Sequence, residues 1–179
     1  VNALEVALDG DPHDGEIGIA HTRWATHGEP SVRNAHPHVC RDTVALVHNG
    51  IIENHESLRA KQIEAGHVFD SDTDTEVIVN SICDHVDAGK DLLESVQQTV
   101  RDIDGAYALG VVTKIDENRL IVARRGSPLV IGLGVGENFV ASDSFALLPV
   151  TQRFIFLQEG DVAEVTRHSV SVYDDSGES

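Results

Sequence analysis

The chain has 179 residues, of which 41% are hydrophobic, and a formal net charge of −17. That length suits one domain, which can bury roughly two-thirds of its unfolded surface without disulfide bonds. Thirty acidic residues against thirteen basic ones repel phosphate backbones and anionic lipid headgroups, which disfavours binding to nucleic acid or a membrane surface. No apolar run approaches the roughly 20 residues that span a bilayer. The two cysteines are too few for a disulfide framework, which fits a cytoplasmic protein.

The two ends of the sequence suggest that it is part of a longer chain. It contains no methionine and opens on Val1-Asn2-Ala3-Leu4. Because translation begins with methionine, we expect the N-terminus to be processed or cropped. The tail 174–179 is polar enough to begin a linker, so we also expect further protein downstream.

The first half of the chain is predicted to contain two short strands and three helices. Glu16–Ala20 is an apolar run before a polar segment, and Thr43–His48 is a second strand that the turn-forming pair Asn49-Gly50 should stop. Capping residues, apolar residues at helical spacing and glycines delimit the helices. We expect these helices to run from Asn54 to Gly66, from Asp74 to Gly89 and from Asp91 to Ile103.

After Gly105 the sequence changes to short runs rich in β-branched residues, separated by turn residues. This pattern predicts a meander of antiparallel strands. The strands are expected at 106–112, 119–123, 129–132, 139–141, 153–157, 161–165 and 169–173. Helices in the first half and strands in the second predict the α+β class, with helices packed on antiparallel sheet.

The densest polar cluster is His21–Gly28, directly after the first expected strand. An arginine among hydroxyls and imidazoles, here Arg23, can bind a carboxylate through two parallel hydrogen bonds. The cluster also contains the only tryptophan, Trp24. From these residues alone, a ligand site and a solvated loop with a structural ion pair are both open interpretations.

Asn49-Gly50 is a second candidate. An asparagine followed by glycine places an amide side chain close to an unobstructed backbone N–H, which is how an oxyanion site is built. The same pair is also the commonest hairpin turn signal. By itself it therefore favours the turn.

Ser71–Glu76 stands at the start of an expected helix. Acidic and hydroxyl residues at such a position cap free N–H groups and suit the helix dipole, and we expect that role for most of them. Capping does not explain two aspartates, Asp72 and Asp74, with interleaved threonines. One of these aspartates could instead pair with the ammonium group of a ligand.

Five histidines support a rival interpretation as a metal site. They fall within 28 residues, and imidazole is the commonest type of zinc ligand. These residues are His21, His27, His36, His38 and His48. However, the sequence has no HExxH helix and neither cysteine sits at CxxC spacing, so a metal site is the less favoured interpretation.

Eight segments carry a resemblance to a known family. They are GIAHTRWATHGEPS (Gly18–Ser31), NAHPH (Asn34–His38), VHNGIIENHE (Val47–Glu56), SDTDTEVI (Ser71–Ile78), DGAYAL (Asp104–Leu109), ARRGSPLVIGLG (Ala123–Gly134), ENFVASD (Glu137–Asp143) and ALLPVTQRFIFLQEGD (Ala146–Asp161). Together they resemble the glutaminase domain of the glutamine–fructose-6-phosphate aminotransferase (isomerizing) family, also called glucosamine-6-phosphate synthases. These are class II glutamine amidotransferases of the N-terminal-nucleophile hydrolase superfamily. The resemblance covers almost all of the chain from about Glu16 onward.

The resemblance implies a pocket for glutamine. Arg23 would bind the α-carboxylate, with Thr26 and His27 in the same pocket, and Asp74 would receive the α-ammonium. A free amino acid carries one carboxylate and one ammonium, so the site needs both a cation and an anion.

The resemblance also implies the groups that act on the side-chain amide. Asn49 through its side chain and Gly50 through its backbone N–H would form the oxyanion hole, and Trp24 would lie beside the pocket and help to close it. No metal ligand is implied.

The family's nucleophile has no counterpart in this sequence. In the family it is an N-terminal cysteine whose own α-amine acts as base. Here the first residue is Val1, and Cys40 and Cys83 carry no free α-amine. Cys83 faces an apolar helical stripe and is expected to be a core residue. The polypeptide as written is therefore expected to have no glutaminase activity.

The fold implied by the resemblance is a four-layer αββα sandwich of two antiparallel sheets between helices, here incomplete at the N-terminus. Residues 1–179 would be a partial glutaminase domain. The parent enzyme would transfer the amide nitrogen of L-glutamine to fructose 6-phosphate, giving glucosamine 6-phosphate and glutamate. Sugar isomerase domains beyond Ser179 would receive the ammonia, and the full enzyme would be a cytoplasmic homodimer. No cofactor, nucleic acid or membrane is implied.

Two alternatives stay open. The first is the glutaminase domain of another class II amidotransferase, of the phosphoribosyl-pyrophosphate type, which a downstream phosphoribosyltransferase domain would identify. The second is a non-catalytic, histidine-rich metal-binding module, which zinc titration would identify.

Overall fold

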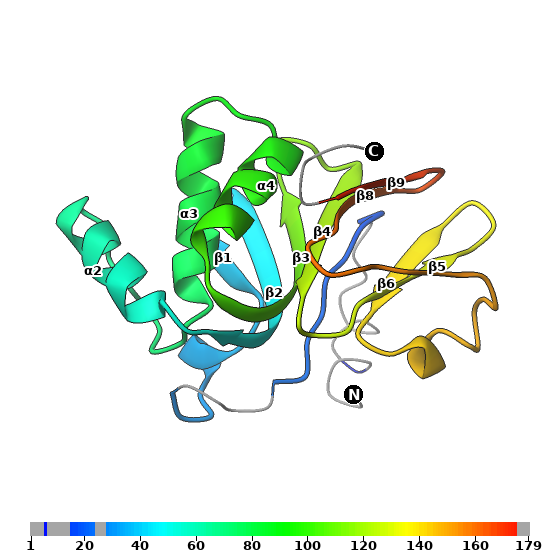
Figure 1. Ribbon diagram of the computed structural model, residues 1–179, viewed down its shortest axis with the longest axis horizontal. Helices are drawn as coiled ribbons and strands as arrows, with labels where there is room; N and C mark the ends of the chain where they lie inside the picture. The colour runs from blue at the N-terminus through cyan, green and yellow to red at the C-terminus, as the bar shows by residue number, and fades with distance from the viewer. Residues whose placement is uncertain (1–5, 7–14, 24–27, 175–179) are drawn as a thin grey trace.

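The computed structural model describes residue 6 and residues 15–23 and 28–174, which form helices and two antiparallel sheets (Figure 1). The helices are α2 (His55–Glu64), α3 (Glu76–Asp87) and α4 (Leu92–Asp102), with 3₁₀ turns η1 (Val32–Asn34) and η2 (Ser144–Ala146). The strands are β1 (His38–Cys40), β2 (Val44–Ile52), β3 (Gly105–Thr113), β4 (Arg119–Arg125), β5 (Val130–Leu133), β6 (Asn138–Ala141), β7 (Phe154–Phe156), β8 (Val162–Thr166) and β9 (Val170–Tyr173). In this part of the chain, no helix is long and apolar enough to cross a membrane.

The larger sheet has the strand order β1-β2-β3-β4-β8-β9, and all its neighbouring strands are antiparallel. Its longest pairing joins β2 to β3, and the register runs from Val44 opposite Thr113 to Ile52 opposite Gly105. The smaller sheet has the order β6-β5-β7. The prediction of a simple meander is therefore wrong, because β4 pairs with β8 and the three strands between them form a sheet of their own.

The predicted turn at Asn49-Gly50 is also wrong. Both residues lie inside β2 and pair with β3. The buried positions of β2 continue beyond them to Ile52, which is 0% exposed. Burial of that residue and pairing along the whole strand outweigh the local preference of an Asn-Gly pair for a turn.

Two apolar cores explain the layers. Between the helices and the larger sheet lie fully buried residues such as Ile78, Ile82 and Leu109. On the opposite face of that sheet, Val122 packs with Ile131 of the smaller sheet. Figure 1 shows α3 and α4 on one side of the larger sheet and β5 and β6 on the other. The α+β class and the two-sheet sandwich are confirmed, and the described residues supply the helical layer on the larger sheet only.

The three helices begin and end close to the predicted residues. The carboxylate of Asp91 caps α4 by accepting a backbone hydrogen bond from its first turn. Gly66 and Gly89 follow α2 and α3 with φ values of +99° and +89°, which glycine adopts readily at helix ends. Asn54 precedes α2 but does not cap it. Its side chain instead bonds to the backbone of residues 102 and 104 and so joins α2 to the end of α4.

The predicted strand Glu16–Ala20 has no strand assignment in the structure. Its residues line a cavity of about 860 Å³ between the two sheets, together with Val47 of β2 and Val140 of β6. The apolar character of this segment is therefore explained by its place between the sheets, and not by pairing in a ladder.

Candidate active site

A cavity of about 500 Å³ brings together the predicted site residues that the structure describes. Arg23, Asn49, Gly50 and Asp74 all line it. The walls come from residues 20–23, from β2 and β3, from the loop before α3, and from β6. Three further predicted site residues lie outside the described residues: Trp24, Thr26 and His27.

Gly50 lets the backbone of β2 approach β3 beside this cavity. Its φ is +136°, and a Cβ atom there would lie 1.9 Å from the carbonyl oxygen of Ala106. Gly105 on β3 is similar, because its φ is +122° and a Cβ atom would lie 2.2 Å from the carbonyl oxygen of Ile51. Only glycine fits at either position. The two backbones therefore meet closely where β2 reaches the cavity.

The amide of Asn49 is oriented by His21. The Nε2 atom of His21 lies 2.6 Å from the Oδ1 atom of Asn49. Because a carbonyl oxygen can only accept, Nε2 must carry the proton in this pair. With Oδ1 held in this way, Nδ2 is the amide atom that remains to donate into the cavity, as an oxyanion site requires. From the sequence, His21 is expected as part of the polar cluster His21–Gly28 and as a candidate metal ligand, and neither prediction includes its hydrogen bond to Asn49.

Asp74 is a buried carboxylate, 3% exposed, on the loop before α3. Its Oδ2 atom accepts a hydrogen bond from the backbone N–H of Ile52 at 2.8 Å. This bond attaches the loop to the end of β2, two residues beyond Gly50. The cavity therefore has an anionic group at a fixed place beside the candidate oxyanion donors.

Glu76, in the first turn of α3, shapes the loop that carries Asp74. Its two carboxylate oxygens accept from the backbone N–H groups of Asp70 and Ser71 at 2.8 and 2.7 Å. Thr75 occupies the N-cap position, but its side chain makes no capping hydrogen bond. The predicted capping role is therefore wrong for Thr75, because its hydroxyl group bonds to His36 and His48, which also line the cavity.

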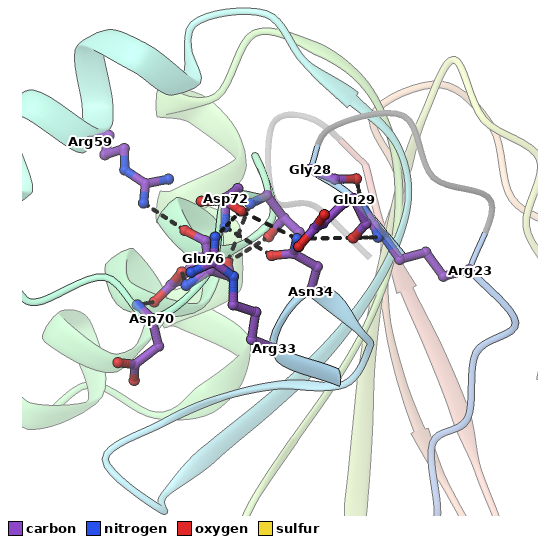
Figure 2. A network of polar contacts seen from close by, with 11 residues as sticks. Arg23, Gly28, Glu29, Arg33, Asn34, Arg59, Asp70, Asp72 and Glu76 are labelled. Carbon is purple, nitrogen blue, oxygen red and sulfur yellow. Dashed lines mark hydrogen bonds and ion pairs between the residues drawn. The ribbon is translucent and has the colours of Figure 1, made fainter. Parts of the chain in front are cut away.

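Arg23 stands at the other side of the cavity. Its guanidinium group donates to the carbonyl oxygens of Gly28 at 3.1 Å and Glu29 at 3.2 Å, as Figure 2 shows. The side chain is thereby held against its own loop. A guanidinium group has five N–H donors in a planar arrangement, and two of them hold the side chain against this loop.

Three imidazoles bond to the threonines of the loop before α3. The Nε2 atom of His38 lies 3.0 Å from Oγ1 of Thr73, and Oγ1 of Thr75 lies 3.2 Å from His36 Nε2 and 2.9 Å from His48 Nδ1. These bonds explain the threonines interleaved with the aspartates. Within residues 15–23 and 28–174, no three His, Cys, Asp or Glu side chains are grouped so as to hold a metal ion.

Burial shifts the titration of these histidines. It lowers the pKa of His36 to about 3, and the neighbouring His21, His38 and His48 act in the same direction. Burial also lowers the pKa of His48 to about 4, against the opposing effect of the Asp74 carboxylate. Both imidazoles are therefore neutral at pH 7 and serve as hydrogen-bonding groups.

These shifts predict a loss of stability in acid. The unfolded chain protonates histidine near pH 6.5, whereas folded His36 and His48 stay neutral until about pH 3 and 4. The unfolded state therefore binds more protons in this window, and the free energy of unfolding should fall by about 4 kcal/mol between pH 7 and pH 5. Urea unfolding at several pH values measures this. His36→Gln should make the dependence shallower, exposed His168→Gln should not, and equal stability at both pH values would contradict the prediction.

Neither cysteine is a plausible nucleophile in this fold. Cys40 and Cys83 are free and buried, with exposures of 6% and 0%. Burial, aided by the neighbouring Cys83, raises the pKa of Cys40 to about 12, and burial also raises the pKa of Cys83. A thiol must ionise to attack, so both act as core residues, and the prediction for Cys83 is confirmed.

Comparison with known proteins shows the family to which the chain belongs. The glutamine amidotransferase domain matches the chain over residues 21–149. The chain belongs to the glutamine amidotransferase domain family. This amidotransferase domain is 58% identical over 177 residues to a glutamine–fructose-6-phosphate aminotransferase (isomerizing) of Shewanella oneidensis, and 54% identical over 173 residues to one of Pseudomonas syringae pv. tomato. The matches cover 99% and 97% of the chain, which spans 29% and 28% of the length of these relatives.

Comparison with solved structures also shows the fold of the amidotransferase domain. It is similar to the glutamine phosphoribosylpyrophosphate amidotransferase of Bacillus subtilis, with a TM-score of 0.71 and 25% identity. The match covers 87% of this chain and 34% of that one. A domain protein of the glutamine aminotransferase class II from Silicibacter pomeroyi has a TM-score of 0.54 at 17% identity, which shows the fold alone.

Proposed function

We propose that this chain is the glutaminase part of a longer enzyme, which transfers the amide nitrogen of L-glutamine to fructose 6-phosphate and yields glucosamine 6-phosphate and glutamate. The observation that carries the proposal is one cavity lined by Arg23, Asp74, Asn49 and Gly50. Relatives that carry this activity in their names are up to 58% identical over 99% of the chain. In this proposal the remaining domains receive the ammonia, and the whole enzyme is a homodimer.

Substrate recognition follows from the charges of the cavity. Arg23 binds the α-carboxylate, and Asp74, buried and held by a backbone N–H, accepts from the α-ammonium. Thr26, His27 and Trp24 complete the pocket on the Arg23 side in this proposal. The side-chain amide of glutamine then points toward Asn49 and Gly50.

The chemistry is acyl transfer through a thioester. A cysteine thiolate supplied by the N-terminus of the longer enzyme attacks the amide carbon, and the carbonyl oxygen becomes an oxyanion. The Nδ2 group of Asn49, oriented through His21, and the backbone N–H of Gly50 donate to that oxygen, and one such donor contributes about 3 kcal/mol to the transition state. Ammonia leaves, and water hydrolyses the glutamyl thioester to glutamate. No step calls for a cofactor.

Glutamine binding tests the proposal without needing the nucleophile. Isothermal titration of the 179-residue chain should show binding of one L-glutamine, and Arg23→Gln should weaken it by about 30-fold, because hydrogen bonds to charged groups contribute about 1.5–3 kcal/mol. Arg101→Gln, on the exposed side of α4, is the matched control and should leave the affinity unchanged. Absence of glutamine binding to the unaltered chain would refute the proposal.

A second candidate is supported by the solved structures. The TM-score of 0.71 with a phosphoribosylpyrophosphate amidotransferase is compatible with a glutaminase that feeds ammonia to a phosphoribosyl acceptor. The lower sequence identity, 25% against 58%, favours the sugar-phosphate acceptor. Product analysis of the longer enzyme with fructose 6-phosphate and with phosphoribosyl pyrophosphate distinguishes the two.

A further inference from the structure

Asn34 is a fully buried asparagine, 0% exposed, at the end of η1 and outside the lining of the cavity. Its Nδ2 atom donates to the carbonyl oxygen of Glu29 at 3.0 Å and toward Oδ2 of Asp72 at 3.4 Å. Its Oδ1 atom accepts from the backbone N–H of Asp72 at 2.9 Å. Only the amide oxygen can accept from an N–H, so the orientation of the amide is determined. One side chain thus joins two separate loops, as Figure 2 shows.

The first of these loops carries the cation of the site. The carbonyl oxygen of Glu29 accepts from Asn34 and also from the guanidinium group of Arg23. Gly28, which also accepts from Arg23, has a φ of +75°, and a Cβ atom there would lie 2.6 Å from Nδ2 of Asn34. The backbone that holds Arg23 therefore packs directly on the amide of Asn34.

The second loop carries the anion of the site. Asp72 lies two residues before Asp74 in the same loop, and Asn34 holds its backbone N–H. Hydrogen bonds from the Arg33 guanidinium group and, to a smaller extent, from the Asn34 amide lower the pKa of the Asp72 carboxyl group. Its carboxylate is therefore ionised at pH 7 and acts as an acceptor only. From Asp72 the chain leads to Asp74, which is fixed in turn on Ile52.

We propose that Asn34 is a positioning residue that holds Arg23 and Asp74 at the separation needed to bind the α-carboxylate and the α-ammonium of one α-amino acid. This inference rests on the proposed function, in which the two residues bind the α-carboxylate and the α-ammonium. Both groups are attached to the same carbon atom of the substrate, so Arg23 and Asp74 must be fixed relative to each other. Fixing them before the substrate arrives reduces the entropy that binding must overcome. A buried amide that uses both of its donors and its acceptor is suited to this task.

Three ligands separate this role from a general effect on folding. They are L-glutamine, 4-carbamoylbutanoate, which lacks the α-ammonium, and 4-aminobutanamide, which lacks the α-carboxylate. Asn34→Asp keeps the shape and the acceptor for Asp72, but places an oxygen against the Glu29 carbonyl and the Asp72 carboxylate. NMR titration of the chain should show the dissociation constant of glutamine rising about 10-fold or more, since two loops must then be ordered on binding. The constants of the two shortened ligands, each of which meets one loop, should change by less than about threefold.

Two further variants complete the test. Gly28→Ala leaves Asn34 unaltered but places a Cβ atom 2.6 Å from its Nδ2 atom and 3.0 Å from the Cβ atom of Asp72. It should therefore force the two loops apart and give the same pattern among the three ligands. Asn80→Asp also puts a carboxylate in a buried position, on α3. It should change the dissociation constants of glutamine and of the two shortened ligands by the same factor. Equal weakening of all three ligands by Asn34→Asp, or unchanged glutamine binding, would overturn the inference. Failure of the unaltered chain to bind glutamine would instead overturn the proposed function, and the inference with it.

Discussion

Replacing Asp74 with asparagine should weaken glutamine binding by at least about 100-fold, because removing one partner of a buried ion pair costs about 3–5 kcal/mol. The side chain is 3% exposed, so little water is present to solvate an unpaired α-ammonium. Asparagine keeps an oxygen that can accept from the backbone N–H of Ile52, and the loop should therefore stay attached to β2. The loss should appear in the dissociation constant measured by isothermal titration, with little change in the free energy of unfolding.

Asp70→Asn is the matched control for this prediction. Asp70 belongs to the same loop, but its side chain is exposed and Figure 2 shows it directed away from the other residues drawn. The charge of the loop changes equally in both variants, so any long-range electrostatic effect on glutamine is shared. Affinity for glutamine within about twofold of the unaltered chain is expected for Asp70→Asn. The same small effect for Asp74→Asn would show that the α-ammonium binds elsewhere.

Gly50→Ala should be among the most destabilising single substitutions in the chain. The added Cβ atom would lie 1.9 Å from the carbonyl oxygen of Ala106 and 2.7 Å from its carbon, both in the backbone of the paired strand. A backbone contact of this kind cannot be relieved by turning a side chain, so β2 and β3 must separate beside the cavity. We expect a loss of about 4 kcal/mol or more in the free energy of unfolding, measured by urea unfolding, and loss of glutaminase activity in the longer enzyme.

Gly89→Ala separates the steric effect from the conformational one. Gly89 also has a positive φ, +89°, but no atom lies within 4 Å of the position of its Cβ. Its substitution should therefore cost only the strain of a left-handed backbone, about 1–2 kcal/mol. If the two alanine variants were equally stable, the close approach of β2 and β3 at Gly50 would not exist in solution.

The sequence predicted many elements close to where the structure has them, because their signals are local. The caps and glycines that bound α2, α3 and α4 act within a few residues of the helix ends. Strands β3 to β9 were found from short β-branched runs between turn residues. These runs by themselves predicted one meander, and the two sheets were implied only by the family resemblance. Which strands join which sheet depends on which face of β4 the strands 130–156 cover. That choice is made by burial of residues such as Ile131 against Val122, and no local pattern records it.

For the candidate site as well, the sequence indicated the types of residue, whereas the contacts between them were found only in the structure. Arg23 was proposed from its chemistry, and the family resemblance selected Asp74 from two aspartates, whereas His21 was interpreted as a member of the polar cluster and a candidate metal ligand. Its role toward Asn49 depends on a contact between residues 28 positions apart. Asn34 was quoted only as part of a motif, because nothing in its immediate neighbours shows that it joins two loops.

The sequence by itself determined the family and the α+β class, and it supplied the cationic, anionic and amide groups that line the candidate site. Only the tertiary structure decided that Asn49-Gly50 continues a strand, because the competing ladder is made with residues of β3 far along the chain. It also decided which atoms of Asn49 and Asn34 face which partners. The physical reason is that an isolated turn or amide has several states of similar free energy, and long-range pairing and burial select one of them.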